Sequence, residues 1–105
     1  PTENTTFSCT YAVPEELPND WISIPIGRPI ANSSAFVLDQ QGRPVPTGAP
    51  GELHVGGSGL ASGYLGAAAD DVSRAKFFVP DSGPLAGNRL YATGDLCRVR
   101  ACGSL

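Results

Sequence analysis

The chain has 105 residues, of which 41% are hydrophobic and 16% are charged, and its net charge is −3. This length supports one small core, and the composition excludes an intrinsically disordered chain. With only seven basic residues, a nucleic-acid partner is not expected, because neutralising phosphates takes clustered Lys and Arg. No apolar run approaches the roughly 18 residues of a membrane span, and no leader opens the chain, so we expect a soluble, cytoplasmic protein.

Glycine, proline and cysteine usage narrows the fold class further. Thirteen glycines and ten prolines predict many turns and short strands rather than a helical bundle. The three cysteines, Cys9, Cys97 and Cys102, lack CxxC spacing and a companion pair of histidines, which indicates free thiols rather than a disulfide framework or a zinc site. The chain begins at Pro1, contains no methionine, and stops just after a turn signal at Gly103, so we expect a fragment of a larger protein.

The first half of the chain reads as short strands. Residues 5–13 are rich in β-branched and aromatic side chains and predict an extended segment or a strand. The apolar run 34–38 suits a strand covered on both faces, whereas residues 43–46 contain two prolines and should form an edge or extended segment. In the short strand 53–55, strict alternation buries the two aliphatic side chains and turns His54 outward, so we expect His54 on the surface.

The second half contains the one expected helix, residues 67–76. Its acidic side chains lie toward the N-terminal end and its basic ones toward the C-terminal end, as the helix dipole favours. Val72 and Ala75 should face inward, and residues 77–79 should enter the core. Pro80 should end this segment, and an exposed loop should follow it.

The last expected strands are residues 90–93 and 96–101, which a turn at Gly94 separates. The fold class is therefore mainly β with α+β character, namely a small, distorted antiparallel β-barrel-like unit with one short helix. We place this unit in residues 26–105. Residues 1–25 would be the end of a preceding subdomain and a connector.

A glycine-rich loop follows the strand 53–55, in the stretch GELHVGGSGLASGYLG. Such loops can cradle a phosphate through backbone N–H groups. Here, however, Gly57, Gly59 and Gly63 give GxGxxxG with no helix start behind them, and the nearest lysine, Lys76, lies too far along the chain for a mononucleotide loop. These residues favour a structural turn over a phosphate site.

Three turns combine a carboxylate or hydroxyl with a bend: Thr2-Glu3, Glu52, and Thr93-Gly94-Asp95. A carboxylate on a bend between strands can point into a cleft, but each of these turns taken singly is ordinary. For Glu52 a structural role is favoured, because its carboxylate can accept local backbone N–H groups in a tight turn.

Taken in order, three stretches resemble the core motifs of the adenylation domains of nonribosomal peptide synthetases. PTE at the start resembles the end of the family's aromatic-Gly-Pro-Thr-Glu motif, GELHVGGSGLASGYL resembles GEL…GxGLARGYL, and YATGDLCR resembles YRTGDLxR. The spacers IPIGRPIANSSAFVLD and RPVPTGAPGEL are also similar to those of the family. The resemblance covers essentially all 105 residues and implies a fragment of a larger adenylate-forming domain.

The resemblance implies an ATP-dependent ligase with Mg²⁺. In this family an amino acid's carboxylate attacks the α-phosphate of ATP, and the acyl group then passes to the phosphopantetheine thiol of a peptidyl carrier protein that works beside condensation domains. It implies Thr2 and Glu3 as the catalytic pair, with Thr2 donating to the α-phosphate and Glu3 binding Mg²⁺. Asp95 would accept hydrogen bonds from the ribose hydroxyls, and Thr6 and Phe7 would line the amino-acid pocket.

The chain departs from the family pattern at Ser62 and Ala92, where arginines are usual. Losing surface ion pairs there would cost about 0–1 kcal/mol, but losing arginines that dock the mobile C-terminal domain would weaken the second step. The family's phosphate loop and catalytic lysine would lie outside this chain, so the isolated chain should be inactive and bind ATP poorly. An acyl-CoA synthetase-like enzyme and a non-catalytic β-rich binding module stay open as alternatives.

Overall fold

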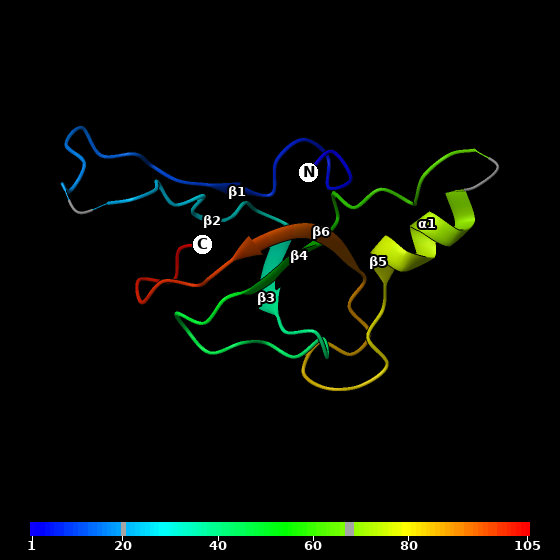
Figure 1. Cartoon of the computed structure of the whole chain (residues 1–105). Helices are drawn as coiled ribbons and strands as arrows, with labels where there is room; N and C mark the ends of the chain where they lie inside the picture. The colour runs from blue at the N-terminus through cyan, green and yellow to red at the C-terminus, as the bar shows by residue number, and fades with distance from the viewer. Residues whose placement is uncertain (20, 67–68) are drawn as a thin grey trace.

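A computed structural model describes residues 1–19, 21–66 and 69–105. Its main element is a four-stranded antiparallel sheet with the strand order β3-β4-β6-β5. Figure 1 shows this sheet at the centre of the molecule, with β6 curling across β4. The strands of the sheet are β3 (Ser33–Leu38), β4 (Gly51–Gly57), β5 (Phe77–Phe78) and β6 (Leu90–Cys97).

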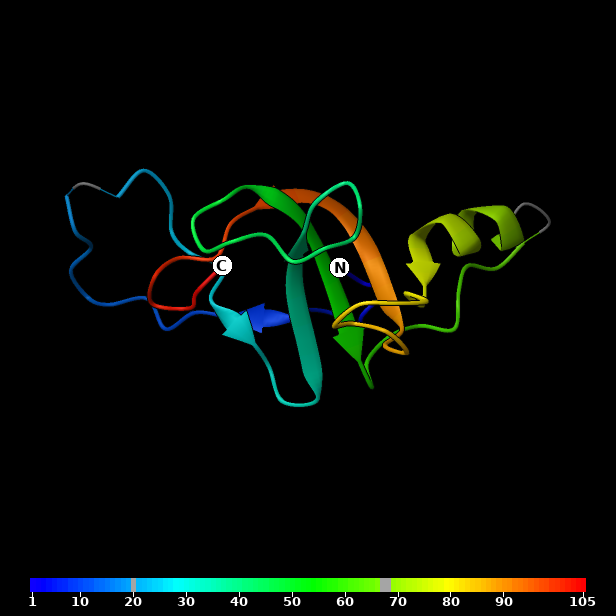
Figure 2. The ribbon, with the colours of Figure 1, turned by 90° about the horizontal axis from the view of Figure 1, so that it is seen from below.

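Two smaller elements extend from opposite sides of the sheet. Strands β1 (Cys9–Thr10) and β2 (Arg28–Pro29) form a short antiparallel ribbon, and helix α1 (Ala69–Lys76) leads directly into β5. Figures 1 and 2 both show the ribbon with its long loop on one side and α1 on the other. The described chain is accordingly elongated, with extents of 49 × 27 × 22 Å.

The sheet carries a buried cluster on each face. Leu90 and Tyr91 are neighbours on β6, so their side chains point to opposite faces. The cluster around Tyr91 contains Phe77 and two residues of β4, and the cluster around Leu90 contains Leu38 and Leu85. The expected fold class, mainly β with one short helix, is therefore confirmed, and the sheet is a curled half-barrel.

Several predicted strands are present with different bounds. Both apolar strands of the first half are confirmed, each extended by at least one residue, as β3 and β4. The proline-containing segment lies along the edge of β3 as expected, with a bridge between Leu38 and Pro44 and a hydrogen bond from the Val45 amide to the Val37 carbonyl. The strand expected at residues 5–13 is reduced to β1, because only two of these residues find a partner in β2.

The outward placement of His54 is wrong, since this side chain is only 6% exposed. Strand β4 is an inner strand that pairs with β3 on one edge and β6 on the other, and both faces of the sheet are covered. Phe78 from β5 packs edge-on against the imidazole with ring centroids 5.5 Å apart. The Nδ1 atom lies 3.1 Å from the Glu52 carbonyl oxygen, so the buried ring has a polar partner.

The inward placement of Val72 and Ala75 is also wrong, because both are exposed. Helix α1 projects from one side of the molecule, and it contacts β5, β6 and, through Ser73, the glycine-rich loop at Tyr64. The first two residues of the predicted helix, 67 and 68, lie outside the described residues. Of the aromatic segment that follows, Phe77 is buried and Phe78 half-buried, whereas Val79 is 49% exposed.

The described parts of the chain contain no helix with the length and apolar character needed to cross a bilayer. The two strands predicted at residues 90–93 and 96–101 are one continuous strand, β6, that ends at Cys97. The turn expected at Gly94 is instead a bulge within this strand, described below. The three cysteines have free thiols, two of them partly buried and Cys102 exposed.

Candidate functional site

The first motif folds into a tight turn at the start of the chain. The Asn4 amide donates a hydrogen bond of 3.1 Å to the Pro1 carbonyl, and the Asn4 side chain, 1% exposed, donates through Nδ2 to Ser8 Oγ at 2.8 Å. This buried amide anchors the turn. The hydroxyl of Thr2 and the carboxylate of Glu3 lie together at its surface, with Thr2 Oγ1 donating to Glu3 Oε2 at 3.3 Å.

The glycine-rich loop of the second motif packs directly on this turn. Its Ala61 amide donates to the Glu3 carbonyl at 2.7 Å, and Thr5 Oγ1 donates to the Gly59 carbonyl at 3.0 Å. A Cβ atom added to Gly59 would lie 3.0 Å from Asn4 Oδ1, which is closer than nearly all real Cβ contacts. The loop therefore has the structural role that its residues favour, and what it holds in place is the segment that carries Glu3.

Two tyrosines connect Glu3 to the second and third motifs. Tyr64 from the glycine-rich loop donates its phenol proton to Glu3 Oε1 at 2.7 Å, and the Tyr91 oxygen lies 3.1 Å from that of Tyr64. The hydrogen bond from Tyr64 holds the pKa of Glu3 below its ordinary value, and burial raises the pKa of Tyr91 above its own. Neither tyrosine was predicted as a site residue from the sequence, although each stands inside one of the family-like motifs, GYL or YATGD.

The core of the sheet fixes these tyrosine rings. Phe77 lies against both, with ring centroids 5.7 Å from Tyr64 and 4.9 Å from Tyr91. The Arg89 guanidinium lies 4.8 Å above the Phe77 ring and donates to the Ala61 carbonyl at 2.7 Å and to the Ser62 carbonyl at 2.9 Å. A stacked arginine thus ties the glycine-rich loop to the same aromatic group.

The third motif forms a β-bulge in β6. Leu53 of β4 faces the three residues Thr93, Gly94 and Asp95, because pairing resumes only on either side of them. Thr93 Oγ1 donates to the Leu53 carbonyl at 2.8 Å and accepts from the Asp95 amide at 3.0 Å. The Gly94 amide donates to Glu52 Oε1 at 2.9 Å. A bulge re-aims the side chains of its strand, and the Asp95 carboxylate is exposed.

Glu52 therefore has the expected structural role, but the N–H group that it accepts differs from the expected one. Its carboxylate accepts an N–H group from the neighbouring strand rather than from its own turn. The two positions where the family usually has arginine also differ from each other, since Ser62 is exposed and Ala92 is 9% exposed. Position 92 is thus buried in the sheet of this chain and is not a surface ion-pair position.

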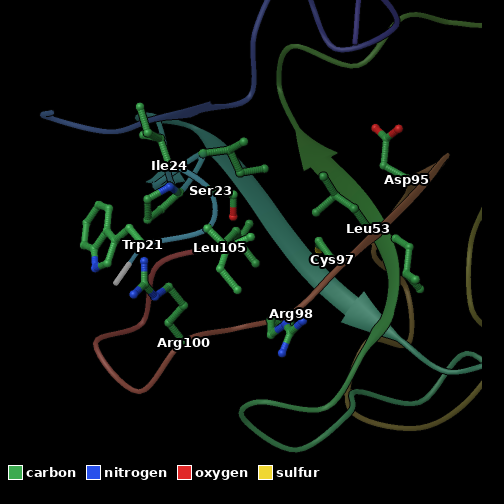
Figure 3. A pocket seen from close by; sticks show the side chains of 13 residues that line it. Trp21, Ser23, Ile24, Leu53, Asp95, Cys97, Arg98, Arg100 and Leu105 are labelled. Carbon is green, nitrogen blue, oxygen red and sulfur yellow. The ribbon is translucent and has the colours of Figure 1, made fainter. Parts of the chain in front are cut away.

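Three of the predicted site residues line two separate hollows, and Thr2 and Glu3 line neither of them. Asp95 borders a hollow of about 610 Å³, and Figure 3 shows it on one side with Trp21 and Arg100 on the other. Thr6 and Phe7 border a smaller hollow of about 240 Å³. Within the described residues, the connection from Glu3 to Asp95 is indirect and passes through Tyr91, which stands four residues before Asp95 on β6.

The residues present suit a magnesium ion that arrives with a nucleotide better than a metal centre built from protein alone. Among residues 1–19, 21–66 and 69–105, no group of three or more His, Cys, Asp or Glu side chains could hold a metal ion. Mg²⁺ is commonly held by one or two carboxylates together with substrate phosphates. Glu3 offers one carboxylate of that kind at the surface, next to a hydroxyl.

Comparison with known proteins gives a consistent result. The family model "AMP-binding enzyme" matches residues 1–65. Tyrocidine synthase 3 of Brevibacillus parabrevis is 48% identical over 99 residues, and the match covers 93% of this chain and 1% of that protein. The solved structure of PA1221, an NRPS protein containing adenylation and PCP domains, is 37% identical with a TM-score of 0.82 and covers 100% of this chain and 21% of that one.

A second solved structure, of AB3403, is described as a four-domain nonribosomal peptide synthetase bound to AMP and glycine. It is 40% identical with a TM-score of 0.81, and the match covers 99% of this chain and 7% of that one. The chain therefore spans only a small part of each of these proteins, and it matches them along nearly its whole length.

Proposed function

The chain belongs to the AMP-binding enzyme family, and we propose that it is part of an adenylation domain that activates an amino acid for nonribosomal peptide synthesis. The observation that supports this proposal is the meeting of three motifs that are far apart in the sequence. Glu3 of the first motif, Tyr64 of the second and Tyr91 of the third form one hydrogen-bonded group. Such convergence indicates a site rather than three unrelated turns.

In the proposed reaction, an amino-acid carboxylate attacks the α-phosphate of ATP and pyrophosphate leaves. Negative charge then grows on the phosphate oxygens, and positioned donors stabilise it. The Thr2 hydroxyl would donate to an α-phosphate oxygen, and Glu3 would hold Mg²⁺ through its carboxylate. The ion, when bound, would neutralise part of the developing charge. Glu3 is ionised at neutral pH, as a metal ligand must be, and its lowered pKa favours the ionised form further.

Asp95 would accept hydrogen bonds from the two ribose hydroxyls and so orient the nucleotide. Its exposed carboxylate at the border of the larger hollow supports this role. Its contribution would be positioning rather than chemistry. Thr6 and Phe7 would form one small and one large wall of the amino-acid pocket, and their place along the smaller hollow supports this.

The second step would transfer the aminoacyl group from AMP to the phosphopantetheine thiol of a peptidyl carrier protein. The carrier domain of PA1221 supports this partner. Condensation domains would then use the loaded carrier. Since ATP is the co-substrate, we place the activity in the cytoplasm. We also retain residues 1–25 as the end of a preceding subdomain, with the rest of the adenylation domain as the chain's main partner.

The test uses the complete domain that carries this chain and measures amino-acid-dependent exchange between ATP and pyrophosphate. We expect Asp95→Ala to lower the exchange rate about 100-fold, because hydrogen bonds to a charged acceptor are lost. Asp81→Ala is the matched control, since Asp81 is an exposed aspartate in a loop. Unchanged exchange in a folded Asp95→Ala domain would reduce Asp95 to a turn residue. Activation of acids without an amino group, followed by transfer to CoA, would instead indicate the acyl-CoA synthetase alternative.

A further inference from the structure

The hydrogen bonds between Glu3 and the two tyrosines have a fixed direction. An ionised carboxylate can only accept, so the Tyr64 phenol proton points at Glu3 Oε1 over 2.7 Å. The Tyr64 oxygen is then the acceptor for its other neighbour, and Tyr91 donates to it over 3.1 Å. The buried phenol of Tyr91 thus orients that of Tyr64, which in turn orients Glu3.

This chain of hydrogen bonds starts in the core and ends at the surface. Tyr91 is 5% exposed and Phe77, which packs against both tyrosine rings, is 8% exposed. The Tyr64 backbone is also held, because its amide donates to Ser73 Oγ of α1 at 2.8 Å. Both phenols are therefore fixed before any ligand arrives, which is the arrangement that positioning a functional group requires.

The two oxygens of the Glu3 carboxylate have unequal partners. Oε1 accepts the short hydrogen bond from Tyr64, whereas Oε2 accepts a long one of 3.3 Å from the exposed Thr2 hydroxyl. A long hydrogen bond from a rotatable hydroxyl exchanges easily for a cation, and a short one to a charged acceptor does not. Oε2 is consequently the oxygen available to a metal ion. Once a cation replaces the Thr2 hydroxyl at Oε2, that hydroxyl is available to donate to another acceptor.

We propose that Tyr64 and Tyr91 are positioning residues that hold Glu3 Oε1 and thereby present Oε2 to the Mg²⁺ ion that accompanies the nucleotide. The proposal rests on the function proposed above for Glu3. Tyr64 acts directly on the carboxylate and Tyr91 acts through Tyr64, so their effects should be graded. This role acts through the Glu3 carboxylate and requires no contact between either tyrosine and the nucleotide.

The test compares binding of the non-hydrolysable ATP analogue AMPPNP, with and without Mg²⁺, to the complete domain by titration calorimetry. We expect Tyr64→Phe to weaken binding about tenfold in Mg²⁺ and to leave binding in EDTA unchanged. Tyr91→Phe should weaken it about threefold in Mg²⁺ only. Tyr11→Phe is the control, because that ring packs against Trp21 away from Glu3 and should change neither measurement.

Each outcome has a definite meaning. Folded variants with the same Mg²⁺-dependent gain in affinity as the wild-type domain would overturn the proposal, as would equal losses with and without Mg²⁺. Should Tyr64→Phe not fold, the same comparison on Tyr91→Phe decides. A wild-type domain that neither binds AMPPNP nor exchanges pyrophosphate with any amino acid would instead contradict the proposed function itself.

Discussion

The two ends of strand β4 lie at two glycine-containing segments, the glycine-rich loop and the bulge of β6, that hold the candidate site in different ways. At its C-terminal end, Gly57 leaves the sheet and enters the glycine-rich loop, which packs on the turn that carries Glu3. At its N-terminal end, Glu52 accepts a hydrogen bond from Gly94 and so supports the bulge that carries Asp95. One strand thus serves both halves of the proposed nucleotide site.

The surroundings of the two glycines differ sharply. Gly57 has a φ of +113°, and a Cβ atom added there would lie 2.1 Å from the Asn32 carbonyl oxygen. Gly94 has a φ of +85°, and the nearest atom to an added Cβ would be Lys76 Nζ at 3.7 Å. The glycine-rich loop therefore depends on close backbone packing, whereas the bulge depends on backbone conformation and side-chain hydrogen bonds.

The largest expected effect is that of Gly57→Ala. The added methyl group must displace the backbone of Asn32, which directly precedes β3. The alanine would also have to adopt a backbone conformation that L-residues avoid. We expect local destabilisation of at least about 3 kcal/mol. Hydrogen exchange in the peptides covering β3 and β4, measured on the complete domain, would report it. Exchange as slow as in the wild-type domain would show that the backbone adapts to the methyl group. The glycine-rich loop would then be no more tightly packed than the bulge at Gly94.

The same substitution in the bulge should cost less. The added methyl group of Gly94→Ala meets only Lys76 Nζ, at an ordinary contact distance, so only the conformational penalty of about 1–2 kcal/mol applies. We expect faster exchange in β6 with β3 unaffected, and weaker binding of AMP because Asp95 follows directly. A loss of stability equal to that of Gly57→Ala would mean that the bulge is as tightly packed as the glycine-rich loop.

The strands that the sequence predicts correctly are those whose signal is local. The apolar run of β3 and the alternating residues 53–55 of β4 are sufficient to identify both strands. The burial of His54 was not predictable from alternation, because it depends on Phe78 from a distant strand covering that face. Likewise, Thr93-Gly94-Asp95 has the composition of a turn, and only the pairing with β4 makes it a bulge within one strand.

The residues of the candidate site also fall into those that the sequence identifies and those that only the structure identifies. Thr2, Glu3 and Asp95 were identified through motifs that resemble those of a family, and such motifs can be recognised from the residue types alone. Tyr64, which donates to Glu3, and Tyr91, which contacts Tyr64, lie 61 and 88 positions further along the chain, and Phe77 packs against both rings. No local pattern reports such a contact, because it exists only once the sheet has formed.

The smallest expected effect isolates the hydrogen bond from the shape of the bulge. Glu52→Ala removes the acceptor of the Gly94 amide, and since both residues are reached by water, the cost should be about 1 kcal/mol or less. Glu52→Gln keeps a carbonyl oxygen in place and should restore most of it. The measurement is hydrogen exchange at the Gly94 amide, which should accelerate in Glu52→Ala and return toward the wild-type rate in Glu52→Gln. If both variants exchange alike, the bulge is maintained by Thr93 and the backbone alone, and Glu52 would have no part in presenting Asp95.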